Sequence, residues 1–144
     1  MAVVGSTIQV DLHLTEDADM DTVRGVVRQN GARVHSDLAQ RLRQTVEERA
    51  RSTLDGHGVE DYDLGVNVDL VADRVPGAPR ERVTVTLDFE GDDGVVAAID
   101  DAVSPPDRAR LADALEETTQ NYLHQYDLRG AVEVTVSVTP IQFR

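Results

Sequence analysis

Four segments of this chain alternate apolar and polar residues with a period of two, and this alternation constrains the fold more than any other feature. The segments are residues 7–14, 64–72, 83–90 and 132–139. Successive side chains of an extended strand point to opposite faces of a sheet, so each segment is predicted to be a strand with one buried and one solvated face. Four such strands require an apolar layer that covers one side of the sheet.

The stretch between the first two segments has the periodicity of a helix. Residues 20–54 place Met, Val and Leu side chains mostly three or four positions apart, which aligns them on one helical face. Acidic and capping residues at 15–21 favour a helix start, and the glycines of residues 56–58 favour its end. The Asn30-Gly31 pair inside this stretch predicts a kink or a junction of two helices.

Helical patterns also separate the third and fourth segments. A short helix is predicted over residues 95–103. A longer helix is predicted to begin with Ser104 as its N-cap and Pro105 in its first turn, and to end at Gly130. Its apolar face carries Leu111, Leu115, Thr118 or Thr119, Tyr122 and Tyr126.

Turn and loop residues divide the remaining chain. Residues 73–79 contain two prolines, which cannot donate to a ladder, and they predict a turn that joins two strands into a long hairpin. Residues 90–94 predict a loop. After Pro140 the apolar parity changes to Ile141 and Phe143, which we expect to face inward after a bulge or in a strand that changes partners.

The order of these elements is β-α-β-β-α-β, which is the split β-α-β arrangement of ferredoxin-like folds. We therefore predict an α+β fold with a four-stranded, mainly antiparallel sheet and both helical segments on one face. We expect residues 1–144 to form a single domain, because neither a linker nor a repeat interrupts the pattern.

Charge is the strongest compositional signal. The chain has 27 acidic and 14 basic residues, a net charge of -13, and all of its basic residues are Arg. An Asp-rich surface without Lys is suited to molar salt, where screening removes the repulsion between like charges. The composition resembles that of proteins from extremely halophilic archaea and their viruses. A bacterial genome rich in G and C is the alternative, although this would explain the missing Lys and not the acidic excess.

Several function classes are disfavoured by the sequence. A net charge of -13 argues against sequence-independent binding to nucleic acid, which depends on clustered Lys and Arg. No apolar run reaches the roughly 20 residues of a membrane span, and residues 1–5 lack the features of a signal peptide. The chain has no Cys, which excludes disulfides and thiolate sites. We expect neither nucleic acid nor membrane among its partners.

No catalytic motif stands out in this sequence. Phosphate-binding loops of the Walker type need a Lys, and the nucleophile elbow Gly-x-Ser-x-Gly does not occur. The acidic runs 17–21, 60–63 and 90–94 are interpreted as capping or hydrated residues rather than cation sites. We predict that the chain is not an enzyme and binds no metal or cofactor. None of its scattered histidines is assigned a catalytic role: His13, His35, His57 and His124.

One part of the chain is locally basic. Residues 24–51 contain seven Arg and three acidic residues, a local charge of +4. One interpretation is a solvated helix surface, and the other is a surface that docks on an acidic neighbouring subunit. The interface candidates are Arg24, Arg28, Arg41, Arg43 and Arg49.

The arrangement of elements resembles that of the small head-to-tail joining proteins of long-tailed viruses, the tail-completion and tail-terminator proteins. The resemblance rests on the opening strand 8–14, the Arg-bearing helix 21–54, the hairpin 64–90 and the closing strand 132–143. It implies a structural protein without a cofactor that forms a homo-oligomeric ring, often six-fold, and contacts neighbouring structural proteins.

With the halophilic composition, the implied source is a tailed virus of haloarchaea, and the implied location is the neck or tail of the virion. The alternative is a ferredoxin-like regulatory or ligand-binding module in the cytoplasm of a halophile.

Overall fold

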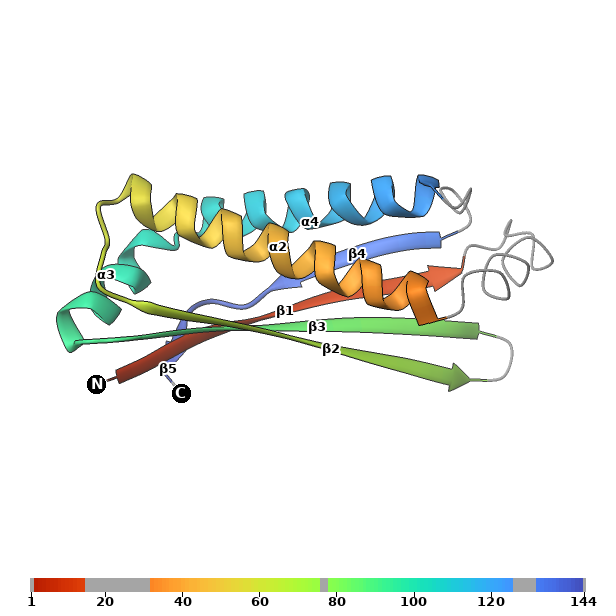
Figure 1. The fold of residues 1–144 in the computed structure, drawn as a ribbon, viewed down its shortest axis with the longest axis horizontal. Coiled ribbons are helices and arrows are strands. Elements are labelled where there is room, and N and C mark those ends of the chain that lie inside the picture. Colours follow the sequence, from red (N-terminus) through yellow and green to blue (C-terminus); the bar gives the residue numbers. More distant parts are fainter. Residues whose placement is uncertain (1, 15–31, 76–77, 126–131, 144) are drawn as a thin grey trace.

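The computed structural model of the chain describes residues 2–14, 32–75, 78–125 and 132–143. Within these residues, helices lie on one face of a twisted sheet (Figure 1). The elements are β1 Ala2–Leu14, α2 Ala32–Gly56, β2 Asp63–Val75, β3 Ala78–Gly91, α3 Asp93–Ala102, α4 Pro105–Gln125, β4 Val132–Val138 and β5 Gln142–Phe143.

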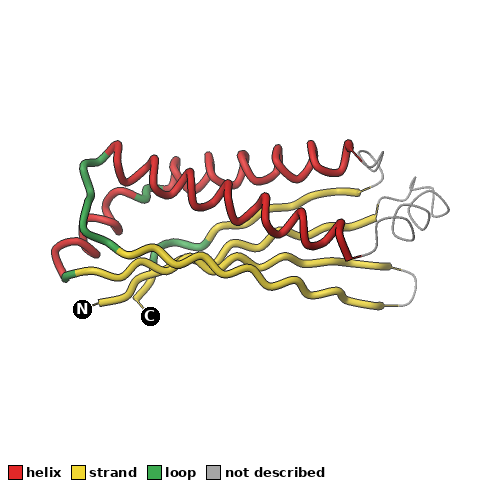
Figure 2. Tube along the Cα trace, viewed as in Figure 1, coloured by secondary structure: helices red, strands yellow, loops and turns green. Residues whose placement is uncertain are grey.

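The sheet has the strand order β2-β3-β1-β4, and the short β5 also pairs with β1. Every described pairing is antiparallel. The first strand therefore lies between β3 and β4, which is the split arrangement predicted from the element order. The predicted α+β fold with helices on one face is confirmed (Figure 2).

The apolar residues of the alternating segments form the buried face of the sheet. Ile8 of β1 and Val85 of β3 are paired across the ladder, and both side chains are fully buried. The helices complete this layer with Leu42 and Val46 of α2 and Leu115 of α4. Further core residues are Val4, Val10, Leu12, Leu38, Leu54, Val83, Leu87, Phe89, Val96, Ile99, Tyr122, Leu123, Val132 and Val134.

The opposite face of the sheet is polar. Thr7 of β1 lies beside Thr86 of β3, and the Arg82 guanidinium forms an ion pair with Asp11 at 2.8 Å. All three described helices lie on the other face (Figures 1 and 2). Strands that are apolar on one side and polar on the other are typical of a sheet with one covered and one solvated face.

The first described helix covers part of the predicted stretch. Helix α2 is described from Ala32 onward, so the start predicted at residue 21, the acidic run 15–21 and the Asn30-Gly31 kink lie outside the described residues. Its predicted end is confirmed. The Leu54 carbonyl accepts hydrogen bonds from the backbone N–H groups of His57 and Val59, and Gly58 takes a φ of 69°, which only glycine adopts readily.

The hairpin is longer than predicted, and its turn is shorter. Strand pairing continues through Arg74↔Pro79 to Val75↔Ala78, so residues 73–79 are not a turn as a whole. The ladder between β3 and β1 ends at His13↔Arg80, and Pro79 lies beyond this end. A proline is tolerated there because β1 forms no hydrogen bond that would need an N–H group at residue 79. Pairing also carries β3 through Gly91, which leaves Asp92 alone between β3 and α3 in the predicted loop 90–94.

The C-terminal segment corrects two further predictions. After β4, the Thr139 carbonyl accepts a 2.6 Å bond from the Ser6 hydroxyl, and the chain then pairs with β1 again as β5. The interruption after residue 138 is confirmed, but the strand does not change partners. Phe143 is 79% exposed instead of buried, because a two-residue strand at the sheet edge has a neighbour only on the β1 side.

Candidate functional site

A recess of about 320 Å³ lies between the C-terminal half of α2 and the first turns of α4. Its apolar lining includes Leu87 and Phe89 of β3, which are buried in the core, together with Val103, which precedes α4, and Leu111 of α4. A volume near 300 Å³ is at the lower end of the range found for small-molecule sites.

Small side chains on α2 leave this space open. Four of the positions that line the recess are Ala50, Ser52, Thr53 and Gly56. Earlier in α2 the core positions carry larger side chains, Leu42 and Val46, which are fully buried. The recess therefore follows from the change to small residues in the last turns of α2, since α4 packs beside them without a large side chain to fill the gap.

The rim of the recess is positively charged. Arg49, Arg108, Arg110 and His57 line it, against one carboxylate, Asp107. The three arginines and Asp107 give a local charge of +2 with His57 neutral, in a chain whose net charge is -13. Arg49 forms no ion pair with any described residue. This arrangement can hold an anionic group.

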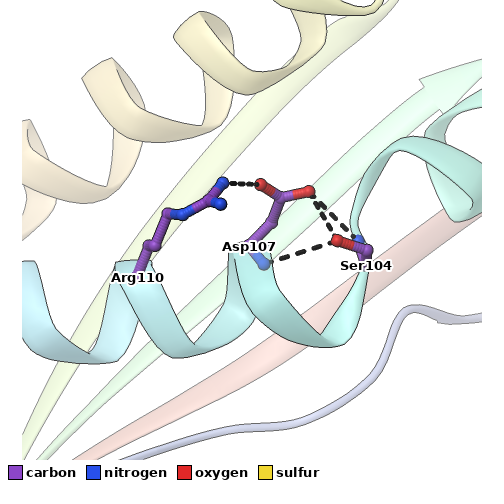
Figure 3. Close-up of polar contacts among 3 residues, drawn as sticks. All are labelled: Ser104, Asp107 and Arg110. Carbon is purple, nitrogen blue, oxygen red and sulfur yellow. Dashed lines mark hydrogen bonds and ion pairs between the residues drawn. The ribbon is translucent and has the colours of Figure 1, made fainter.

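Two of these groups belong to the N-terminal cap of α4 (Figure 3). The Ser104 hydroxyl donates to Asp107 Oδ2 at 2.8 Å, and the Asp107 backbone N–H donates to Ser104 Oγ at 3.4 Å. Arg110 Nη1 holds the other carboxylate oxygen at 3.0 Å. The hydrogen bond from the Ser104 side chain is the main cause that lowers the pKa of Asp107, with Arg110 and His57 adding to it. The predicted N-cap at Ser104 is confirmed.

This cap predicts a pH-dependent effect of Asp107→Asn. The lowered pKa means that the charged Asp107 stabilises the fold fully above its ordinary pKa, and that this stabilisation is lost as the pH falls through the lowered value. At neutral pH we expect the variant to be less stable than the parent by about 1 kcal/mol. Denaturant unfolding at a series of pH values should show this difference shrinking in acid. Asp113→Asn, an exposed change on the same helix, should show no such difference.

A second surface lies along the edge of β2 that no described strand pairs with. A recess of about 530 Å³ runs between α2 and this strand, lined by Arg43 and Glu47 of α2 and by Asn67 and Val68 of β2. Strand β2 pairs with β3 without interruption from Asp63↔Glu90 to Val75↔Ala78. A long regular edge of this kind presents backbone groups that another strand can pair with.

The structure places the candidate arginines in three different environments. Arg41 lies over the ring of Tyr122, 5.5 Å from its centroid, and so packs against α4. Arg43 lies beside the β2 edge, and Arg49 lies on the rim of the first recess. Arg24 and Arg28 lie outside the described residues. The described arginines therefore do not form one docking face.

The three histidines whose side chains are described are not gathered into one site. His57 lines the first recess, whereas His13 lies in β1 and His124 in the last turn of α4. The side chain of His35 is outside the described part of the chain. Within the described residues, no three His, Asp or Glu side chains are placed to hold a metal ion, and no helix is long and apolar enough to cross a membrane.

The sequence did not predict the first recess. It pointed to Arg49 as an interface residue and to Ser104 as a cap, but it gave no reason to bring α2 and residues 103–111 together. A signal was present in the small residues Ala50, Ser52, Thr53 and Gly56, which occur where a helix packed on both a sheet and a neighbour would ordinarily carry larger side chains.

No protein-family model and no curated protein matches this chain. Similar solved structures include an amidohydrolase/peptidase from Burkholderia cenocepacia, with 18% identity and a TM-score of 0.40 over 99% of this chain and 28% of that one. A hydantoinase/carbamoylase family amidase from Burkholderia ambifaria has 16% identity and a TM-score of 0.36, over 99% of this chain and 29% of that one. The de novo designed protein Foldit4 has 12% identity and a TM-score of 0.33, over 94% of this chain and 96% of that one.

The chain spans less than a third of the length of the two Burkholderia proteins. With TM-scores below 0.5, these likenesses carry no argument about what this chain does.

Proposed function

We propose that this chain is a structural assembly protein that joins copies of itself into a ring through the edge of β2. The observation that supports the proposal is the regular edge of this 13-residue strand, which among the described residues pairs only with β3. Natural proteins usually shorten, bulge or cover such edges unless another strand pairs with them.

The opposite edge of the sheet offers a matching partner. Strand β2 runs parallel to β1 and β4 runs antiparallel to it, so β2 and β4 are antiparallel to each other. Placing β2 of one copy beside β4 of the next would therefore continue the antiparallel sheet. Because the two surfaces differ, the contact is heterologous and closes into a ring when the rotation between copies allows it.

The charges beside the two edges are complementary. Arg43 lies next to the β2 edge, and α4, which packs on β4, exposes Asp113, Glu116 and Glu117. Glu47 lines the same recess but pairs with Arg51 at 3.4 Å, so Arg43 of one copy would meet the acidic flank of the next. This contact would fix the direction of assembly more than it adds affinity. At molar salt this attraction is screened, so backbone pairing must supply most of the contact energy.

A neck or tail component of a tailed virus of haloarchaea is the setting that we propose for such a ring. This part of the proposal is supported by the element order shared with head-to-tail joining proteins and by the charge of -13 without Lys. The partners in that setting would be further copies of the chain and the neighbouring structural proteins.

The test is the oligomeric mass, measured by light scattering after size-exclusion chromatography in molar KCl and at the lowest KCl concentration at which the protein remains folded. We expect a defined oligomer for the parent in both and, at the lower concentration, where charges are less screened, a clear shift toward monomer for Arg43→Glu, because the new carboxylate faces acidic residues of the next copy. Arg49→Glu makes the same change of charge on the same helix, at the other recess, and should keep the parent mass.

A monomeric parent would contradict the ring, and so would equal masses for the Arg43→Glu variant and the parent. Circular dichroism of each variant separates loss of assembly from loss of fold. The first recess favours a second candidate, the ferredoxin-like ligand-binding module, and a monomer that binds a small molecule there would support it instead.

A further inference from the structure

We infer that the recess between α2 and α4 binds a small amphipathic anion, with its anionic head at the Arg49 side of the rim and its apolar body against Val103 and Leu111. This deepens the ligand-binding candidate. It does not depend on the ring, because the recess is lined by α2, β3 and the start of α4 and does not include the β2 edge.

The apolar part of the site determines the body of the ligand. Leu87 and Phe89 are buried behind the recess, and the partly exposed side chains of Val103 and Leu111 present its apolar surface to solvent. A ligand with a hydrocarbon body would cover Val103 and Leu111 and remove their apolar surface from water. A purely ionic ligand, such as free phosphate, would leave that surface uncovered and gain nothing from it.

The charges of the rim determine the head of the ligand. Arg110 is already paired with Asp107 at 3.0 Å, and Arg108 Nη1 donates to the Val103 carbonyl at 3.2 Å. Of the three arginines, only Arg49 has no hydrogen bond or ion pair with a described residue, so its guanidinium is available to a carboxylate or a phosphate. Because only this one arginine is available, the site suits a ligand with a single anionic group.

The Asp107 carboxylate should lower the affinity of this recess for an anion. It lies on the same rim as Arg49 and opposes an incoming anion, while it also occupies Arg110. Replacing Asp107 by Asn removes one negative charge and frees Arg110. The affinity for an anion should therefore increase, although the cap of α4 becomes weaker.

The experiment is a calorimetric titration with three probes that share one chain: octanoate, octyl phosphate and octanol. It is run on the full chain at the lowest KCl concentration at which the protein remains folded, since chloride screens and competes. We expect saturable binding of an anionic probe at least tenfold tighter than that of octanol, which corresponds to one charge-assisted hydrogen bond. The two anionic arms show whether the head is a carboxylate or a phosphate.

Three variants locate the binding. Arg49→Gln should weaken it about tenfold and Asp107→Asn should strengthen it. Ala50→Leu should abolish it, because the larger side chain fills the recess and changes no charge. Arg51→Gln is the control, since it removes the same charge from an exposed position of α2 that does not line the recess.

Equal affinity for octanol and the anionic probes, or no saturable binding at all, would overturn the inference. An equal loss in Arg49→Gln and Arg51→Gln would also overturn it, because it would reduce the effect to general surface charge. If Ala50→Leu does not fold, the other two variants still test the inference, because the affinity should fall in Arg49→Gln and rise in Asp107→Asn. The ring variant Arg43→Glu should bind like the parent, so a failed ring and a failed site can be told apart.

Discussion

Val85→Asp should leave the chain unfolded at every salt concentration. Val85 is fully buried in the central strand β3, opposite Ile8 of β1 and Val68 of β2. No described basic side chain lies among these neighbours, so an aspartate here would be an unpaired charge in an apolar layer. Burial of such a charge costs several kcal/mol, which is comparable with the whole stability of a domain of this size. Circular dichroism and the dispersion of amide NMR signals would report the loss of fold.

The matched control is Thr86→Asp, one residue further along the same strand. Thr86 lies on the polar face between Thr7 and Asn67, with no carboxylate directly opposite it. Thr84 would be a poorer choice, because Asp69 is its partner on β2. We expect Thr86→Asp to fold and to lose less than about 1 kcal/mol. Equal damage from both substitutions would mean that the polar face is also covered, for example by a neighbouring molecule.

Potassium chloride should stabilise this protein strongly. The net charge is -13, so at low salt the folded chain repels itself. Between about 0.1 and 2 M KCl the Debye length falls from about 10 Å to less than 3 Å. We expect the melting temperature to rise by roughly 10 °C or more, which for a chain of this length corresponds to a few kcal/mol. A scan of melting temperature against KCl concentration measures this directly.

KCl also screens the ion pairs, which lowers the melting temperature, but this effect is too weak to reverse the predicted rise. The described pairs, Asp11–Arg82, Glu47–Arg51 and Asp107–Arg110, are at least partly exposed, and each contributes at most about 1 kcal/mol. Asp100→Asn with Asp101→Asn removes two exposed charges from α3 and should raise the melting temperature at low salt while flattening its salt dependence. A melting temperature that is flat or falls with KCl would contradict the halophilic interpretation.

The elements of the fold were largely predictable, because each depends on a local pattern. Alternation along β1 and β3 located the buried face, and Ser104 with Pro105 located the start of α4. The wrong predictions concern residues whose pairing or burial depends on a neighbouring strand. Pro79 looks like a turn residue, yet it pairs with Arg74 beyond the end of the β1 ladder. Phe143 looks like a core residue, but it lies at an edge that leaves it exposed.

The candidate sites were much less predictable than the elements. Arg41, Arg43 and Arg49 lie within nine residues of one another, and a helix repeats every 3.6 residues, so they point in different directions. The packing of α2 on the sheet decides which of these arginines faces α4, which lies beside β2 and which lines the recess. His57 and Asp107 are 50 positions apart in the sequence, and only packing of α4 beside α2 places both on one rim.

The sequence by itself determined the strand faces, the end of α2, the start of α4, the strand order expected for a split β-α-β chain and the net charge of -13, from which we predict that stability depends on salt. These properties are local or additive, since side-chain periodicity, capping and net charge do not depend on distant contacts. The tertiary structure alone decided the recess, its cationic rim and the position of β2 at the edge of the described sheet. Each of these is a relation between segments remote in sequence, set by the packing of α2 and α4 on one face of the sheet and by the position of β2 at its edge.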